Sequence, residues 1–139
     1  MYSLPLPAVN LIPQQVPFQC IDTLIQCNEE ETRSAFRVPE NHVLCFDGLF
    51  SELALIEVMA QTAAASSGYR KMITGDAVRR GFIGAVKNVK IEALVRSGDE
   101  IEASIRPLHQ VGAASIVVGT VYLKGQLIAS CELTIFTEN

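Results

Sequence analysis

One long apolar segment, residues 49–69, constrains the fold of this 139-residue chain more than any other feature. It is the only stretch that predicts a helix of several turns, because apolar side chains recur in it at helical spacing. The recurring positions are Leu53, Ile56, Ala60 and Ala64. Small residues crowd its second half, so we expect that face to lie close to a covering sheet, and Gly68 is expected to end the helix.

The rest of the chain is expected to form strands, flanked by turn residues such as Gly, Asn and Pro. The strands are expected at residues 18–27, 32–38, 81–93, 100–106, 113–123 and 126–136. Residues 1–17, which include four prolines, are expected to form an N-terminal arm. This order of elements favours a single α+β domain over residues 1–139, in which an antiparallel sheet packs on one central helix.

The charge balance argues against nucleic acid as a partner. Fifteen acidic residues against eleven basic ones give a net charge of −4, whereas phosphate binding needs clustered positive charge. The apolar segment contains Glu52 and Glu57, so it does not resemble a membrane span. The first ten residues lack the basic and apolar regions of a secretory signal. We therefore expect a cytoplasmic protein that binds neither nucleic acid nor membrane.

The four cysteines show neither disulfide nor metal-site spacing. No CxxC pair occurs, and no histidines cluster near them. Cys20 and Cys27 are expected on opposite faces of one strand, because side chains alternate along a strand and these residues are seven apart. We expect reduced thiols and no bound metal.

Several short motifs sharpen the prediction. IPQQVPF at residues 12–18, EVMAQ at 57–61, GFIG at 81–84 and SGD at 97–99 follow one another along the chain. In this order they resemble the β-hydroxyacyl-acyl-carrier-protein dehydratases, whose central helix carries Glu-Ala-Met-Ala-Gln. The resemblance covers about residues 11–137. It implies the hot-dog fold, an antiparallel sheet wrapped around one long central helix.

One motif departs from that family. Before the helix the family carries Gly-His-Phe-Pro-Gly, whose histidine is the catalytic partner of the helix glutamate. Residues 41–48 read NHVLCFDG, which retains a histidine, His42, but not the rest of the motif. A variant branch linked to aryl-polyene synthesis is more similar in this region. His42 precedes Glu57 by fifteen positions, close to the separation in the main family.

Removing water from a β-hydroxyacyl thioester requires a base, an acid, and donors for the thioester oxygen. We expect Glu57 and His42 to be catalytic, with Gln61 one helical turn after Glu57. Asp47 and the backbone N–H groups at the expected helix start, from Gly48 to Glu52, are expected to help bind substrate. Each residue also has a structural interpretation: Glu57 in a surface pair, His42 or Gln61 bonded to a loop, and Asp47 in a turn or helix cap. His109 is expected to be an exposed turn residue.

Four basic residues follow the apolar segment in this acidic chain: Arg70, Lys71, Arg79 and Arg80. They are either a solvated surface or a docking site for an acidic acyl carrier protein, which the resemblance implies. The resemblance also implies an acyl thioester of carrier protein or coenzyme A as substrate, no cofactor, and at least a homodimer with sites at the subunit interface. Two alternatives remain open: a thioesterase, and a non-catalytic acyl-binding or partner subunit.

Overall fold

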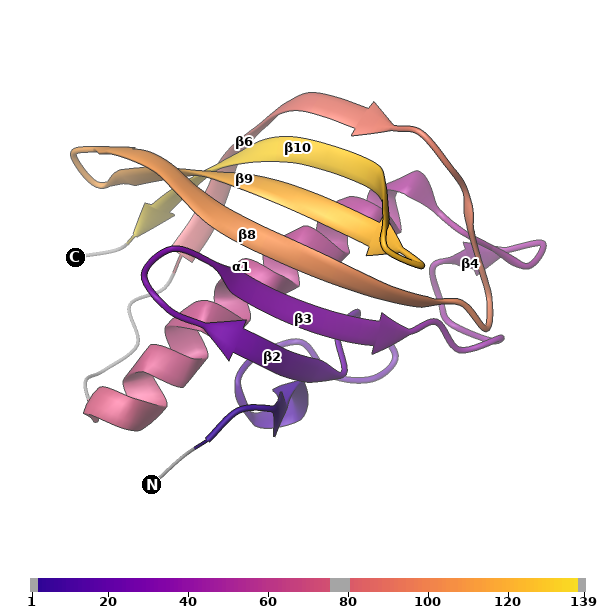
Figure 1. Ribbon diagram of the computed structural model, residues 1–139, viewed down its shortest axis with the longest axis horizontal. Coiled ribbons are helices and arrows are strands. Elements are labelled where there is room, and N and C mark those ends of the chain that lie inside the picture. Colours follow the sequence, from indigo (N-terminus) through magenta and orange to yellow (C-terminus); the bar gives the residue numbers. More distant parts are fainter. Residues whose placement is uncertain (1–2, 76–80, 138–139) are drawn as a thin grey trace.

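The computed structural model describes residues 3–75 and 81–137. In it, a seven-stranded antiparallel sheet curves around one long helix, α1 (Glu52–Thr74) (Figure 1). The strand order is β1-β2-β3-β8-β9-β10-β6. These strands are β1 (Leu6–Pro7), β2 (Thr23–Cys27), β3 (Thr32–Arg37), β8 (Glu100–Val111), β9 (Ala114–Leu123), β10 (Gln126–Thr137) and β6 (Gly81–Ile91). The predicted sheet wrapped around one central helix is confirmed.

The helix α1 ends later than predicted. Ser51 Oγ caps its start by accepting a hydrogen bond from the Ala54 N–H at 3.1 Å. Gly75 ends the last turn in the left-handed conformation, with φ at 76°. The predicted stop at Gly68 is wrong, because this glycine serves packing instead. A Cβ at Gly68 would overlap the backbone carbonyl oxygen of Leu11, so glycine lets the arm lie directly on the helix.

The strand predicted at residues 18–27 begins only at Thr23, as β2. The backbone groups of residues 18–20 bond instead to the side chains of Gln61 and His42, which removes them from any strand ladder. Cys20 therefore lies before β2, and the prediction that Cys20 and Cys27 share one strand is wrong. The arm also contributes to the fold, because β1 pairs with β2 and a 3₁₀ turn, η1 (Ala8–Asn10), follows it.

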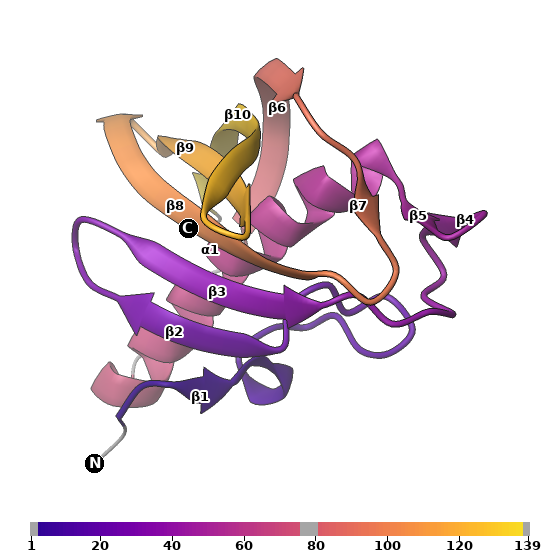
Figure 2. The same ribbon diagram turned by 45° about the vertical axis from the view of Figure 1, so that its right-hand side comes forward.

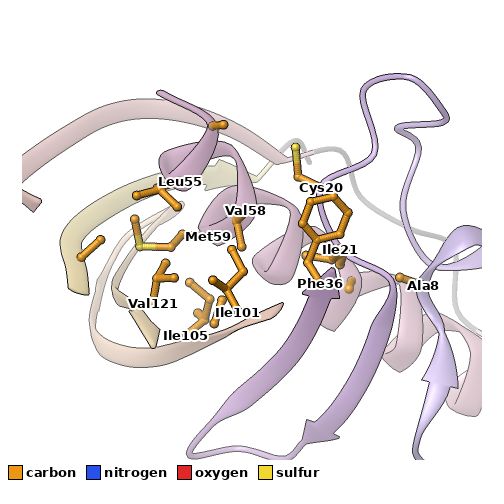
Figure 3. Close-up of a cluster of buried hydrophobic side chains, with 14 of the residues drawn as sticks. Ala8, Cys20, Ile21, Phe36, Leu55, Val58, Met59, Ile101, Ile105 and Val121 are labelled. Atoms are coloured by element: carbon orange, nitrogen blue, oxygen red, sulfur yellow. The ribbon is translucent and has the colours of Figure 1, made fainter. Parts of the chain in front are cut away.

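The core lies between α1 and the concave face of the sheet. From the helix, Leu55, Val58 and Met59 point toward side chains of β8 and β9 (Figure 3). Glycine at position 119 makes room for this packing, because a Cβ there would lie 2.7 Å from Met59 Sδ. The small residues expected against the sheet divide between two places. Ala65 lies in the core and Ser66 contacts Cys27 of β2, whereas Ala60, Ala63 and Ala64 line a cavity. An apolar helix of this kind has no clear polar face, so periodicity alone could not identify the buried side.

Strand β8 is longer than predicted. It continues past Arg106 to Val111 through an irregularity between Pro107 and His109. His109 is exposed as predicted, but it lies in this strand and not in a turn.

A second, small sheet lies beside the N-terminal end of α1 (Figure 2). It consists of β4 (Cys45–Phe46), β5 (Leu49–Phe50) and β7 (Val95–Arg96), in the order β4-β5-β7. The segment expected to start the helix thus begins with β5, and the helix starts three residues later than predicted, at Glu52. None of the described helices is long and apolar enough to span a membrane.

Candidate active site

A cavity that contains the predicted site residue Glu57 runs along α1. Its volume is about 660 Å³, within the range of roughly 300–1,000 Å³ that is typical of small-molecule sites. The arm, α1, β6 and β10 form its walls, and small or apolar side chains such as Ala60, Ala64 and Ile83 line much of it. Among the described residues, Glu57 is the one carboxylate in its lining. A carboxylate beside an apolar channel suits proton transfer on a bound acyl chain.

Gln61 holds Glu57 in place. Its side chain is fully buried, and its Nε2 donates to Glu57 Oε1 at 2.8 Å and to the Phe18 carbonyl at 3.0 Å. Its Oε1 accepts a hydrogen bond from the Cys20 N–H at 2.6 Å. These three bonds fix the orientation of the amide and leave neither of its N–H groups free. They favour a positioning role for Gln61, and its predicted contact with substrate stays a prediction.

His42 is buried between two aromatic rings. The rings of Phe36 and Phe50 lie 5.8 and 5.3 Å away, both edge-on. The imidazole Nδ1 accepts a hydrogen bond from the Leu44 N–H at 3.0 Å, so its proton is on Nε2, which donates to the Gln19 carbonyl at 2.9 Å. Both ring nitrogens are therefore bonded to backbone.

Residues 18–20 lie between His42 and Gln61. The carbonyl of Phe18 and the N–H of Cys20 face Gln61, whereas the carbonyl of Gln19 faces His42. This alternation is that of an extended backbone, whose successive peptide groups point in opposite directions. The structure thus brings Gln61 to Glu57, and it joins His42 to them only through this segment.

Cys20 has an inert thiol. Burial, followed by the nearby charges of Glu57 and then Cys45, raises the pKa of Cys20 from 9.0 to about 12. The thiol lies 3.8 Å from His42 Nε2. Because it stays protonated near neutral pH, Cys20 is not a nucleophile here.

Asp47 and Gly48 form the turn between β4 and β5. Both have positive φ, 52° and 77°, as the two central residues of a tight hairpin turn require. Neither lines the cavity that contains Glu57. The observed geometry matches the turn interpretation of Asp47. The helix begins at Glu52 with Ser51 as its cap, at the end of the range in which backbone donors were expected. The substrate-binding role of this pair stays a prediction.

The basic residues are only partly described. Arg70 and Lys71 are exposed on the last turns of α1, and Lys71 lines the cavity. Arg70 donates to the Asn28 carbonyl at 3.3 Å. Arg79 and Arg80 lie outside the described residues.

Within residues 3–75 and 81–137, no three His, Cys, Asp or Glu side chains lie together as a metal site would require.

Sequence reasoning missed Gln14. This residue lines the same cavity as Glu57, and its Oε1 is buried. The signal that could have indicated it is its position inside IPQQVPF, the first of the motifs that carried the family resemblance.

A family model described as ApeP dehydratase matches residues 6–139, which is nearly the whole chain. The chain belongs to the ApeP-like dehydratase family. Membership in the ApeP-like family confirms the predicted resemblance to the variant, aryl-polyene branch of the dehydratases.

The individual proteins to which this chain is similar are also named as dehydratases. A FabZ 3-hydroxyacyl-acyl-carrier-protein dehydratase of Clostridium kluyveri is 26% identical over 130 residues, covering 89% of this chain and 88% of the relative. A FabZ dehydratase of Bacillus velezensis is 22% identical over 131 residues, covering 90% and 91%. Among solved structures, the dehydratase heterocomplex ApeI:P from Xenorhabdus doucetiae matches with a TM-score of 0.85 at 19% identity. That match covers 96% of this chain and 92% of the other.

Proposed function

We propose that this ApeP-like protein is a dehydratase that removes water from β-hydroxyacyl thioesters carried on acyl carrier protein, with Glu57 as the group that moves the proton. The observation that carries the proposal is that Glu57 lies in an apolar cavity and is fixed there by Gln61. The carboxylate takes the proton from the α-carbon, and the C–O bond at the β-carbon breaks. The Glu57 carboxyl then gives this proton up to the departing hydroxyl, which leaves as water, so that the carboxylate is restored and the enoyl thioester remains.

We propose that His42 is the catalytic partner of Glu57, although its imidazole is already bonded to the backbone. Both of its nitrogens are bonded to backbone, so a proton relay through His42 requires one of these bonds to break when substrate binds. The structural interpretation is that His42 supports residues 18–20 and thereby the loop that Gln61 holds. A substitution at position 42 that still donates a hydrogen bond to the Gln19 carbonyl separates the two roles, because it preserves the support of the loop but not the proton relay.

The test is mass spectrometry of the products formed from a β-hydroxyacyl carrier protein. Wild type is expected to release one water, and Glu57→Gln is expected to release none. In His42→Gln the side-chain amide can still donate to Gln19, so activity survives if His42 is structural and is lost if it relays a proton. Circular dichroism shows whether each variant is folded. No water loss in wild type would refute the dehydratase, and a free thiol as product would identify a thioesterase.

We propose a homodimer in which two copies pair through β6. This strand is the edge of the large sheet, and it exposes apolar side chains that a second subunit would cover. They are Phe82, Ile83, Val86 and Val89. Light scattering after gel filtration tests this. A monomer would refute it and favour a different partner chain, since the Xenorhabdus doucetiae neighbour is part of a heterocomplex.

We propose that an acidic carrier protein docks near the end of α1, where Lys71 lines the cavity. Reversing Lys71, Arg79 and Arg80 to Glu should lower turnover of the carrier-bound substrate much more than turnover of a small thioester. Lys124→Glu, an exposed residue of the β9–β10 turn, is the control. Equal losses with both substrates would refute docking.

We also propose a cytoplasmic location. The four cysteines are free, as is usual in a reducing compartment.

A further inference from the structure

Gln14 presents a hydrogen-bond acceptor that the described part of the chain does not use. Its Oε1 is shielded from solvent, and no donor within residues 3–75 and 81–137 reaches it. Buried polar side-chain atoms nearly always have a partner, because an unpaired one loses its bonds to water without replacement. This acceptor therefore points to a donor that comes from outside the described chain.

Gln14 is part of the wall of the cavity that contains Glu57. Two contacts hold the arm against α1 on either side of Gln14. The carbonyl of Leu11 lies against Gly68, and the carbonyl of Phe18 accepts a hydrogen bond from Gln61. Gln14 lies between these two points of contact in the sequence, so the arm presents it along the small-residue face of the helix.

We propose that the Gln14 amide, whose Oε1 is held by no donor of the described chain, turns into the cavity when substrate binds. Its Oε1 then accepts a hydrogen bond from the β-hydroxyl of the bound acyl thioester, which makes the cavity selective for β-hydroxyacyl chains over saturated ones. This inference rests on the proposed dehydratase function and deepens it. A hydroxyl that donates its hydrogen to Gln14 keeps its lone pairs free to receive the proton with which it departs. Gln14 itself gains and loses no proton.

The chemistry of the substrate selects this donor. For Glu57 to reach the α-proton, the α-carbon must lie in the cavity, and the hydroxyl is on the next carbon. Within the acyl thioester unit, the thioester oxygen and sulfur only accept hydrogen bonds, so the β-hydroxyl is the one strong donor. The enoyl product lacks this hydroxyl, and it therefore loses the bond to Gln14 once water has left.

Binding measurements without turnover test the inference. In a Glu57→Gln background, calorimetry compares a β-hydroxyacyl thioester of N-acetylcysteamine with the saturated acyl thioester of equal length. The two ligands share every other donor, so their ratio of Kd values isolates the hydroxyl. We expect the hydroxyacyl ligand to bind about 3- to 10-fold more tightly, the size of one neutral hydrogen bond. Adding Gln14→Leu should bring the ratio close to one.

Two further variants make the result decisive. Gln14→Glu retains an acceptor and should retain the preference, whereas Gln15→Leu, at an exposed neighbouring residue, should leave it unchanged. An unchanged ratio in Gln14→Leu, equal weakening of both ligands, or no preference in the parent protein would each overturn the proposal. Failure of the dehydratase function would appear separately, as an absence of water loss in wild type with Gln14 intact.

Discussion

Replacing Gln61 by Leu should destabilise the protein clearly more than a substitution on its surface. Leucine has a similar size but leaves the buried Cys20 N–H without its bond, which costs about 1–3 kcal/mol. The Phe18 carbonyl also loses a hydrogen bond, but it belongs to an exposed residue and keeps the Cys20 thiol as a donor, so this loss costs about 0.5–1.5 kcal/mol. The added apolar side chain returns roughly 1–2 kcal/mol. With the central values of these ranges, the free energy of unfolding should fall by about 1.5 kcal/mol.

Urea denaturation followed by far-ultraviolet circular dichroism is the suitable assay, because the chain has no tryptophan for fluorescence. The protein concentration is held constant, so that self-association does not alter the midpoint. Gln126→Leu, at an exposed position in β10, makes the same chemical change and should shift the free energy of unfolding by no more than about 0.5 kcal/mol. A loss for Gln61→Leu as small as in this control would refute the reasoning. Since Gln61 also orients Glu57, turnover per folded molecule should fall as well.

Three further predictions follow from single contacts. Gly68→Ala should lower the thermal midpoint of unfolding, because the Cβ of alanine would overlap the Leu11 carbonyl. This effect must outweigh the helix propensity of alanine, which is better than that of glycine by about 1 kcal/mol. An unchanged or higher midpoint would contradict the close packing. Ser51→Ala should lower the unfolding free energy by about 1 kcal/mol through loss of the Ala54 cap, measured in urea, and Ser51→Thr should retain most of it. Above pH 9 the unfolding free energy should fall, because burial raises the pKa of Cys20 from 9.0 to about 12. Between these two pH values the thiol stays protonated in the folded protein but ionises in the unfolded chain. The stability that the protonated thiol provides is therefore complete below pH 9 and is lost between pH 9 and 12. The fall should be shallower in Cys20→Ala, and an identical pH profile in the two proteins would exclude this cause.

Much of the architecture could be predicted because it depends on local patterns. Strands β3, β9 and β10 lie close to their predicted bounds, since alternation and turn residues are encoded within each segment. The errors came from contacts between distant segments. Gly68 is a helix-stop residue by propensity, yet the arm needs it as a packing site inside α1. Residues 18–20 have strand character, yet two side chains far along the chain bind their backbone.

In the candidate site, too, local spacing could be predicted from the sequence, whereas contacts between distant segments could not. Glu57 and Gln61 were predictable as neighbours, because residues four apart share a helix face. The cavity beside them was not, because it depends on how the arm, α1 and the edge of the sheet meet. His42 was predictable as a loop histidine, but its two backbone bonds depend on the path of the loop.

By itself, the sequence determined the order of the long strands and the central helix, the family resemblance and the helix glutamate, because motifs and periodicity are properties of neighbouring residues. Only the tertiary structure decided which face of the helix is buried. The helix has no clear polar face, because its polar side chains are spread around it, so the choice depends on the sheet and the arm that pack against it. The same packing put residues 18–20 between Gln61 and His42 and brought Gln14 into the wall of the cavity, because these contacts join residues that are far apart in the chain.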